Sequence, residues 1–133
     1  MTNTLLLIKP NSIANHNIGE IISIIEKDGF EIQDIKIFTF TNELINNFYQ
    51  EHIGKSFFER LVEFMTSGKT IAIRLSRENA VDRLRMLIGS AKPEEREAGT
   101  IRAIFADTIS KNAVHGSDCS ASVEREVSIL FKS

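Results

Sequence analysis

The residue best suited to covalent chemistry is His115, which stands among small and apolar neighbours near the carboxyl end of the chain. The segment around it reads Asn112-Ala113-Val114-His115-Gly116-Ser117-Asp118. An imidazole has a reference pKa of about 6.5, so it is largely neutral at physiological pH and one ring nitrogen can attack an electrophile. Ser117, Asp118 or Ser120 can cap a following helix, whose first amides favour an anion. We therefore expect an exposed nucleophile in a phosphate-sized niche; the alternative is a turn with an incidental histidine.

Length and composition predict how large a fold must position this ring. The chain has 133 residues, of which 42% are hydrophobic and 26% are charged, so we expect a single domain over residues 1–133. The formal net charge of −2 gives no overall attraction to nucleic acid or to an anionic membrane. Any phosphate chemistry must therefore depend on local positive charge.

The sequence also favours a soluble protein of the cytoplasm. The apolar run at Met1–Ile8 is too short for a secretory signal, and no stretch approaches the roughly 20 apolar residues that span a bilayer. Cys119 is the only cysteine, which excludes an intramolecular disulfide and a cysteine-rich metal site. A free thiol suits a reducing compartment, so we expect a cytoplasmic location.

Hydrophobic periodicity predicts alternating strands and helices in the first half of the chain. A leucine-rich run at residues 4–8 indicates a buried strand ended by Lys9-Pro10. Isoleucines at helical spacing follow and end near Gly29. The β-branched and aromatic run at 31–40 predicts a second strand, and Thr41 is a plausible cap for the next helix.

The second half continues the pattern. Ser56 and Glu59 match a capping box, which predicts a helix ending near Gly68. Residues 70–75 predict a third strand, after which Ser76 is a plausible cap for a helix that stops at Gly89. A polar connection from 90 to 99, an apolar segment at 101–109, a strand at 112–114 and a helix carrying Val123, Val127, Leu130 and Phe131 complete the chain. Connections this long often bind ligands.

This order of elements predicts an α/β fold of the α+β sandwich type. It is similar to a ferredoxin-like βαββαβ arrangement, in which we expect a four-stranded antiparallel sheet with helices on one face. No internal repeat or domain linker is apparent.

The 112–118 segment, Lys9-Pro10 and Gly99-Thr100-Ile101-Arg102 together resemble the active-site signature of nucleoside diphosphate kinases, and the similarity runs nearly end to end. The resemblance implies the ferredoxin-like fold with an inserted loop near residues 90–110. It also implies ping-pong transfer of the γ-phosphate from a nucleoside triphosphate, chiefly ATP, to a nucleoside diphosphate through a phosphohistidine on His115.

The resemblance further implies roles for residues that lie far apart in the sequence. The implied catalytic residues are His115, Glu126, Ser117 and Lys9, with Glu126 orienting the second ring nitrogen and Ser117 bonded near the phosphate. Lys9, Arg85 and Arg102 match phosphate-binding positions, and Lys9 and Asn112 match positions that bind the ribose hydroxyls. Each of these charges could instead be a solvated surface group, and Ser117 could be only a helix cap. Phosphoryl transfer needs fixed cations because charge spreads over the transferred oxygens.

A base-binding segment is implied by the same resemblance. Phe57 matches a residue that stacks on the base, which predicts tolerance of purines and pyrimidines because every base has a π-face. Leu61 matches an apolar base contact, Tyr49 a tyrosine near the histidine, and His52 a histidine on the phosphate side. The alternative for Phe57 is core packing beside Phe58.

One nucleotide-binding position departs from the family pattern. Ala91 stands where the family usually has a threonine whose hydroxyl contacts phosphate. The loss of one such bond, worth about 1.5–3 kcal/mol, predicts weaker binding and reduced activity, with Ser90 or Lys92 as possible substitutes. Ala91 is also the one support for an alternative function, a nucleotide-binding regulatory oligomer with weak or no transfer.

The expected cofactor is Mg²⁺, held mainly by the nucleotide phosphates, because no carboxylate cluster with ligand spacing is evident. Expected partners are ATP and other nucleoside tri- and diphosphates, with no specific nucleic acid and no membrane. The resemblance implies a homo-oligomer, and the end of the chain at Ser133, without the longer tail of many hexameric relatives, leaves tetramer and hexamer open.

Overall fold

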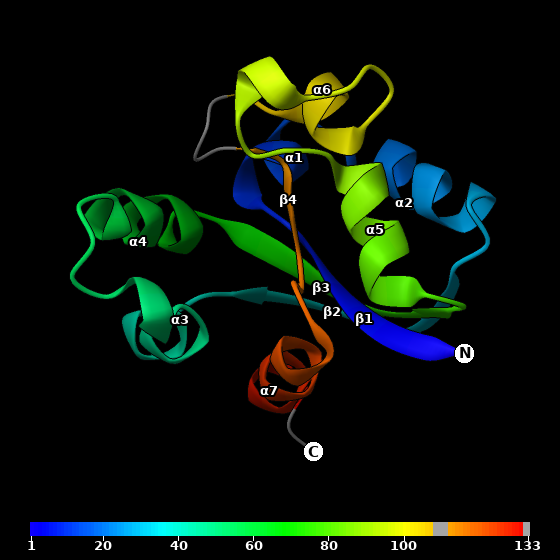
Figure 1. Cartoon of the computed structure of the whole chain (residues 1–133). Helices are drawn as coiled ribbons and strands as arrows, with labels where there is room; N and C mark the ends of the chain where they lie inside the picture. Colours follow the sequence, from blue (N-terminus) through cyan, green and yellow to red (C-terminus); the bar gives the residue numbers. More distant parts are fainter. Residues whose placement is uncertain (108–111, 132–133) are drawn as a thin grey trace.

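A four-stranded sheet forms the centre of the molecule (Figure 1). The computed structural model describes residues 1–107 and 112–131. The strands are β1 (Thr2–Ile8), β2 (Glu31–Thr39), β3 (Lys69–Arg77) and β4 (Val114–Gly116), in the order β2-β3-β1-β4. Each neighbouring pair is antiparallel. The predicted ferredoxin-like sheet is therefore confirmed.

Helices pack on both faces of this sheet. Leu5 and Leu7 of β1 belong to one hydrophobic cluster, Leu6 and Ile8 belong to another, and all four side chains are fully buried. The first cluster includes residues of α3 (Asn42–Phe48), α4 (Phe58–Thr66) and α7 (Ser120–Leu130). The second includes residues of α2 (Ile18–Lys27) and α5 (Ala80–Ile88). The expectation of helices on one face was wrong: successive side chains of a strand point to opposite faces, so the continuous apolar run of β1 requires cover on both.

Two predicted helix boundaries are confirmed by their local geometry. The Oγ1 of Thr41 accepts a hydrogen bond from Leu44 N at 3.1 Å and so caps α3. Gly89 ends α5 with a φ of +86°, where a Cβ would also lie 2.6 Å from Thr100 Oγ1. Both the backbone angle and the lack of space therefore require glycine there.

Two predicted caps are wrong. Helix α4 begins at Phe58, its N-cap is Phe57, and Ser56 makes no capping bond to it. Ser76 lies inside β3, which continues to Arg77 because that residue pairs with Thr2. The first amide of α5, that of Ala80, instead donates to the Oγ1 of Thr2 at 2.9 Å. The cap of α5 thus comes from a strand 78 residues away in sequence.

The described part of the inserted segment, residues 90–107, has regular structure of its own. It contains the short helix η2 (Pro93–Glu95) and α6 (Ile101–Phe105), which Thr100 caps through Ala103 N at 3.3 Å. The predicted apolar segment continued to Ile109, which lies outside the described residues. A five-residue helix, α1 (Pro10–Ala14), also begins where a loop was expected, with proline in its first turn.

The last strand lies two residues later than predicted. Ala113 has a φ of +78°, and Val114 N donates to Asn112 O at 3.0 Å, which makes a tight three-residue turn before β4. Lys9 N donates to Ala113 O at 2.8 Å and ties this turn to the end of β1. His115 therefore lies within a strand and not after one. Helix α7 starts beyond Cys119 without a side-chain cap, so the predicted capping role of Ser117, Asp118 or Ser120 is wrong.

None of the helices in the described part of the chain is long and apolar enough to cross a membrane.

Candidate active site

The imidazole of His115 stands at the edge of the sheet between aromatic rings. His115 pairs with Leu7 of β1, and its side chain remains 21% exposed. The rings of Phe48 and Tyr49, at the end of α3, meet it edge-on with centroids 5.4 and 5.9 Å away. At Gly116 a Cβ would lie 2.6 Å from Ile88 Cδ1, so glycine lets α5 approach this strand. The ring is thus held laterally and still accessible.

One carboxylate from α7 holds the imidazole. The Nε2 of His115 lies 3.1 Å from Glu126 Oε1, and Ser117 Oγ donates to the same oxygen at 2.6 Å. Glu126 is 4% exposed, so this charge has little access to bulk water. A buried carboxylate that accepts from Nε2 fixes the ring orientation and leaves Nδ1 as the nitrogen that can attack.

A buried hydrogen bond joins Lys9, at the end of β1, to Asn112, just before β4. Lys9 directly follows β1, and its Nζ donates to Asn112 Oδ1 at 2.7 Å in a buried setting. Burial, together with the positive charge of Arg102, lowers the pKa of Lys9 to about 7. The side chain therefore sits close to the balance between its charged and neutral forms, and a nearby anion would favour the charged form.

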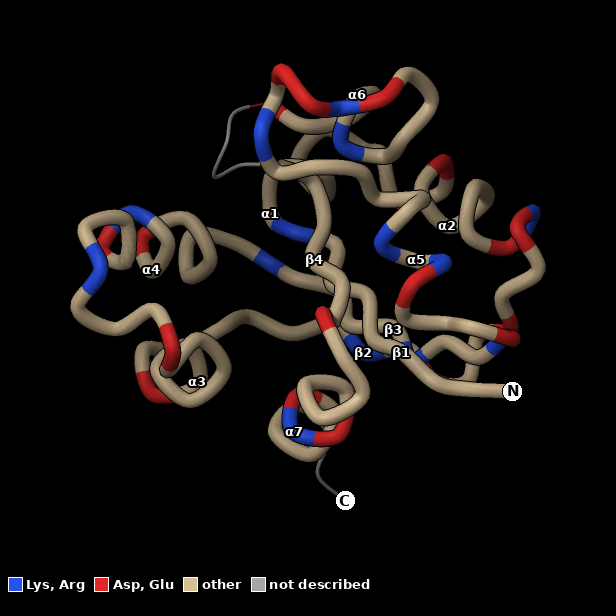
Figure 2. Tube along the Cα trace, viewed as in Figure 1, with Lys and Arg blue, Asp and Glu red and all other residues tan. Residues whose placement is uncertain are grey.

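Arginines supply further positive charge beside β4, and Figure 2 shows basic positions on α5 and around α6. Arg102 of α6 donates to Gly89 O at 3.0 Å and to Val114 O at 3.1 Å. Burial lowers the pKa of Arg102 to about 10, with further lowering by the charges of Arg96 and Arg85. These cations repel one another, and a bound polyanion would relieve that repulsion.

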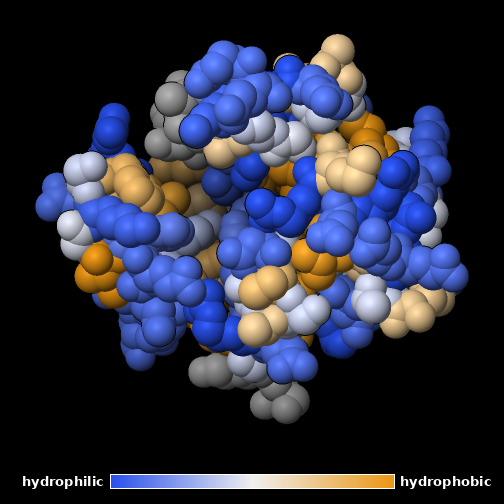
Figure 3. All heavy atoms as spheres, viewed as in Figure 1, coloured by the Kyte–Doolittle hydropathy of each residue, from blue (hydrophilic) through white to orange (hydrophobic). Residues whose placement is uncertain are grey.

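A hollow of about 220 Å³ brings several of these groups together. The predicted site residues that line it are Tyr49, His52, Arg85, Arg102, His115 and Glu126. The others lie outside its lining: Lys9, Phe57, Leu61, Ala91, Asn112 and Ser117. On the face shown in Figure 3, hydrophilic side chains dominate and hydrophobic ones form small separate patches. The hollow thus combines an imidazole, the carboxylate bonded to it and three arginines.

Aromatic residues extend from this hollow towards α4. Burial and the charge of Glu126 raise the pKa of Tyr49, so its hydroxyl keeps its proton and can donate to a ligand. Burial and the charge of Lys55 lower the pKa of His52, in the short helix η1 (Gln50–His52). The ring of Phe57 lies 5.3 Å from that of His52 and is 36% exposed. Phe57 is thus available to a base.

Two other predicted nucleotide contacts, Leu61 and Ala91, lie in surroundings that differ from those of Phe57. Leu61 is 8% exposed and packs in the core cluster with α3, so at most an edge of it can meet a base. Ala91 is exposed in the loop after α5, and its carbonyl accepts from Arg96 Nη2 at 3.0 Å. The nearby Ser90 hydroxyl is engaged within the loop, by Lys92 N and the Glu95 carboxylate.

Sequence analysis missed other groups at the site. Phe48 was not among the expected site residues, yet its ring borders the imidazole. Arg125 and Asp118 also line the hollow. Hydrogen bonds from Ser122 and Cys119 lower the pKa of Asp118, which keeps it ionised. The position of Arg125 next to Glu126 in the sequence could have marked it as a site residue. The packing of α7 on α3, which brings Arg125 to Phe48, could not be predicted from the sequence.

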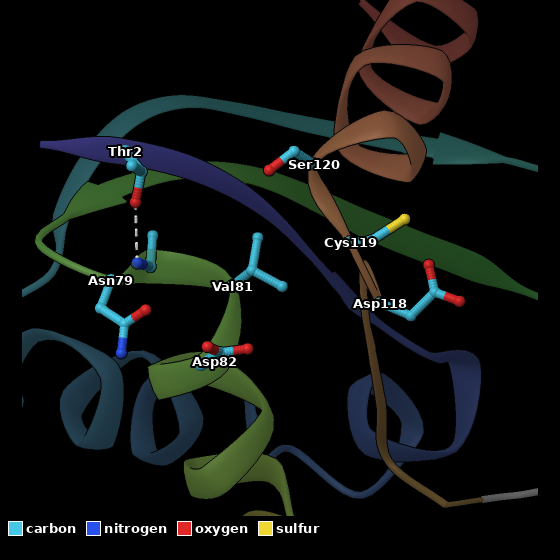
Figure 4. Close-up of a pocket in the computed structure, with 8 residues that line it drawn as sticks. Thr2, Asn79, Val81, Asp82, Asp118, Cys119 and Ser120 are labelled. Carbon is cyan, nitrogen blue, oxygen red and sulfur yellow. Dashed lines mark hydrogen bonds between the residues drawn. The ribbon is translucent and has the colours of Figure 1, made fainter.

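A second hollow, of about 300 Å³, lies between the beginnings of α5 and α7 (Figure 4). Asp82 and Asp118 both line it, and the Thr2 hydroxyl that caps α5 lies at its wall. Among the described residues, neither lysine nor arginine lines this second hollow to offset the two carboxylates, whereas three arginines line the hollow beside His115, so the second hollow does not suit phosphate.

Comparisons with known proteins agree with this geometry. A family model described as "Nucleoside diphosphate kinase" matches residues 2–133. The chain belongs to the nucleoside diphosphate kinase family. Membership makes it a nucleotide-binding phosphotransferase, as the resemblance of its motifs implied.

Named relatives and solved structures of the nucleoside diphosphate kinase family cover almost the whole chain. It is 47% identical to a nucleoside diphosphate kinase of Glaesserella parasuis over 96% of this chain and 93% of that protein. It is 46% identical to one of Exiguobacterium sibiricum over 99% and 96%, respectively. Its fold is similar to that of the Aquifex aeolicus nucleoside diphosphate kinase, with a TM-score of 0.94 and 37% identity over 98% of this chain and 94% of that one. The Encephalitozoon cuniculi nucleoside diphosphate kinase gives a TM-score of 0.96 and 32% identity over 100% and 90%.

Proposed function

We propose that this nucleoside diphosphate kinase uses Nδ1 of His115 as the phosphate carrier. The observation that carries the proposal is the hydrogen bond between Nε2 of His115 and Glu126. Because Nε2 is engaged there, Nδ1 is the ring nitrogen that can attack. In the first half-reaction Nδ1 forms a bond to the γ-phosphorus of a nucleoside triphosphate, chiefly ATP, while the bond to the bridging oxygen breaks. The nucleoside diphosphate leaves, and a second diphosphate takes the phosphoryl group by the reverse sequence.

Fixed cations stabilise the charge on the transferred group in this proposal. Arg85 and Arg102 line the same hollow as His115, so their guanidinium groups can meet phosphate oxygens. Lys9 supplies a buried ammonium, and its hydrogen bond to Asn112 supports a joint role of the two side chains in contacting phosphate and ribose. Ser117 supports the carboxylate of Glu126, because its hydroxyl donates to Oε1.

Nucleotide binding extends outward from the phosphates. Phe57 stacks on the base, with His52 and Tyr49 between it and the imidazole, as the contacts among these rings support. Leu61 contributes an apolar edge. Because Ala91 has no hydroxyl, the loop after α5 offers backbone groups to phosphate and Arg96 braces that loop.

Magnesium is part of the proposal as an ion carried by the nucleotide. No cluster of three histidine, cysteine, aspartate or glutamate side chains that could hold a metal occurs in residues 1–107 and 112–131. Asp118 is the ionised carboxylate on the wall of the hollow that fits such an ion, directly or through water. When bound, the ion would neutralise phosphate charge during transfer.

We further propose a cytoplasmic homo-oligomer, a tetramer or hexamer. Strand β2 is at an edge of the sheet and pairs with β3 alone among the described strands. It exposes Ile35 and Ile37, at 47% and 62%, within a strand that is exposed along most of its length. An edge strand with exposed apolar side chains favours pairing with a second copy.

The test is phosphorylation of the intact protein with γ-labelled ATP and magnesium. We expect a label that is acid-labile and alkali-stable, that moves to added nucleoside diphosphate, and that is absent from His115→Ala. His16→Asn is the matched control, because His16 lies far from the site in sequence and its φ of +61° suits asparagine. A protein that binds nucleotide without becoming labelled would favour the regulatory oligomer instead.

A further inference from the structure

Arg125 connects the helix that carries Glu126 to the end of α3. Its Nη1 donates to Asn47 O and to Phe48 O, and its Nη2 donates to Phe48 O, each at 3.2 Å. These carbonyls belong to the last turn of α3, where no further helical amide reaches them. A guanidinium with two forked donors suits such a pair of oxygens, and a cation at a helix carboxyl end is favourable.

The backbone that Arg125 holds is the backbone that carries the rings around the nucleophile. Phe48 ends α3, Tyr49 follows it, and their rings lie 4.8 Å apart at an angle of 66°. Both rings meet the imidazole of His115 edge-on. A shift at the end of α3 would therefore change the side walls against which the imidazole rests.

The same guanidinium faces the carboxylate that holds the imidazole. Nη2 of Arg125 lies 3.7 Å from Glu126 Oε2, while Oε1 holds His115 and Ser117. The Arg125 side chain is 33% exposed, so this ion pair alone adds little stability. Its effect is geometric: the cation restrains one oxygen while the other oxygen faces the ring.

We propose that Arg125 is a positioning residue that sets the imidazole of His115 for attack, acting through the carboxylate of Glu126 and through the two rings at the end of α3. The inference rests on the proposed phosphate transfer. Arg125 also borders the hollow, but its role differs from that of Arg85 and Arg102 because its guanidinium contacts the end of α3 and the carboxylate of Glu126.

The test compares Arg125→Met and Arg125→Lys with the unmodified protein. Methionine keeps much of the apolar stem and removes both the charge and the donors, whereas lysine keeps the charge and some donor capacity. The measurements are the single-turnover rate constant for labelling of His115 and the KM for ATP. We expect Arg125→Met to lower the rate constant roughly tenfold with little change in KM, because misplacement of a reacting group slows the step itself. Arg125→Lys should give an intermediate rate constant.

Arg74→Met is the matched control. The Arg74 guanidinium lies 5.8 Å from the ring of Phe131, just beyond the other end of α7, and its side chain is 41% exposed. Arg74→Met should leave the single-turnover rate constant unchanged. Equal rate constants for the unmodified protein and both Arg125 variants would overturn the inference. A raised KM with an unchanged rate constant would also overturn it, since Arg125 would then bind nucleotide. If the unmodified protein itself is not labelled, the transfer proposal fails, and the positioning role fails with it.

Discussion

Oε1 of Glu126 accepts two hydrogen bonds, one from Nε2 of His115 at 3.1 Å and one from the hydroxyl of Ser117 at 2.6 Å. Ser117 directly follows β4, and side chains two residues apart in extended chain point to the same side, so both donors reach one carboxylate. This arrangement fixes which nitrogen of the imidazole remains available for phosphate.

Glu126→Gln should slow the labelling of His115. A neutral amide keeps the size of the side chain but replaces a charge-assisted bond with an ordinary one, a loss of about 1.5 kcal/mol that corresponds to about a tenfold lower rate. Single-turnover labelling with ATP measures this effect. Glu124→Gln, an exposed change on the same helix, should leave the rate unchanged; equal rates in the two variants would contradict the orienting role of Glu126.

Binding of a nucleoside diphosphate should be coupled to proton uptake by Lys9. The pKa of the unliganded Lys9 is about 7, so at a pH near 8 the amine is mostly neutral and bound phosphate restores its proton. Uptake approaches about one proton there and declines below pH 7, where the amine is already charged. Calorimetric titration in two buffers of different ionisation enthalpy measures it, with Lys9→Met as the comparison. Equal uptake by both proteins would contradict the assignment.

The lowered pKa of Lys9 also makes the free energy of unfolding depend on pH. Between pH 7 and the ordinary lysine value of 10.5, the unfolded chain holds a proton that the folded, unliganded protein has released. The free energy of unfolding therefore rises with pH in this window, and this contribution is absent from Lys9→Met.

Phe57→Ala should weaken nucleotide binding without affecting the transfer step. Loss of base stacking costs about 1–3 kcal/mol, so the KM should rise about tenfold, by similar factors for purine and pyrimidine nucleotides. Steady-state kinetics with several diphosphates checks this. Phe58→Ala should instead lower the thermal midpoint, since Phe58 packs against the core cluster with α3 and α4. An unchanged KM for Phe57→Ala would refute stacking.

Ala113→Gly should stabilise the protein. The residue holds a φ of +78°, which costs an alanine about 1–3 kcal/mol and a glycine little, so we expect a net gain of about 1 kcal/mol after the greater entropy of unfolded glycine. Urea unfolding measures the change. Ala121→Gly, within α7, should have the opposite sign, because glycine weakens a helix. A loss of stability at position 113 would show that the turn is unstrained.

Ile37→Lys combined with Ile35→Lys should reduce the assembled mass. Charged side chains on an edge strand oppose pairing with a second copy. Light scattering of the purified variant measures the mass directly. Met86→Lys changes a similarly exposed apolar residue, on α5, and should leave the mass unchanged. A monomeric unmodified protein, or a variant of unaltered mass, would remove β2 as the contact surface.

Local patterns predicted much of the fold. The apolar run of β1 identified a buried strand, and the positions of Gly29 and Gly89 marked helix ends, because these signals depend on residues close in sequence. The family motifs also named His115 and Glu126, which the fold brings into contact although they lie 11 residues apart.

Long-range contacts explain what the sequence did not predict. The cap of α5 comes from Thr2, and the start of β4 is set by its pairing with β1, so neither appears in a local window. The contact of Arg125 with Phe48 joins positions 77 residues apart. Interactions of this kind depend on how elements pack, which hydrophobic spacing within one element does not specify.

The central strand β1 couples the two hydrophobic clusters of the molecule. Successive side chains of β1 belong to two separate hydrophobic clusters. We therefore expect the two clusters to unfold together, because loss of β1 from one removes it from the other. We expect its amide hydrogens to exchange with solvent only through global unfolding, in one cooperative transition. The ammonium at its end would then remain in register with the histidine strand for as long as the protein is folded.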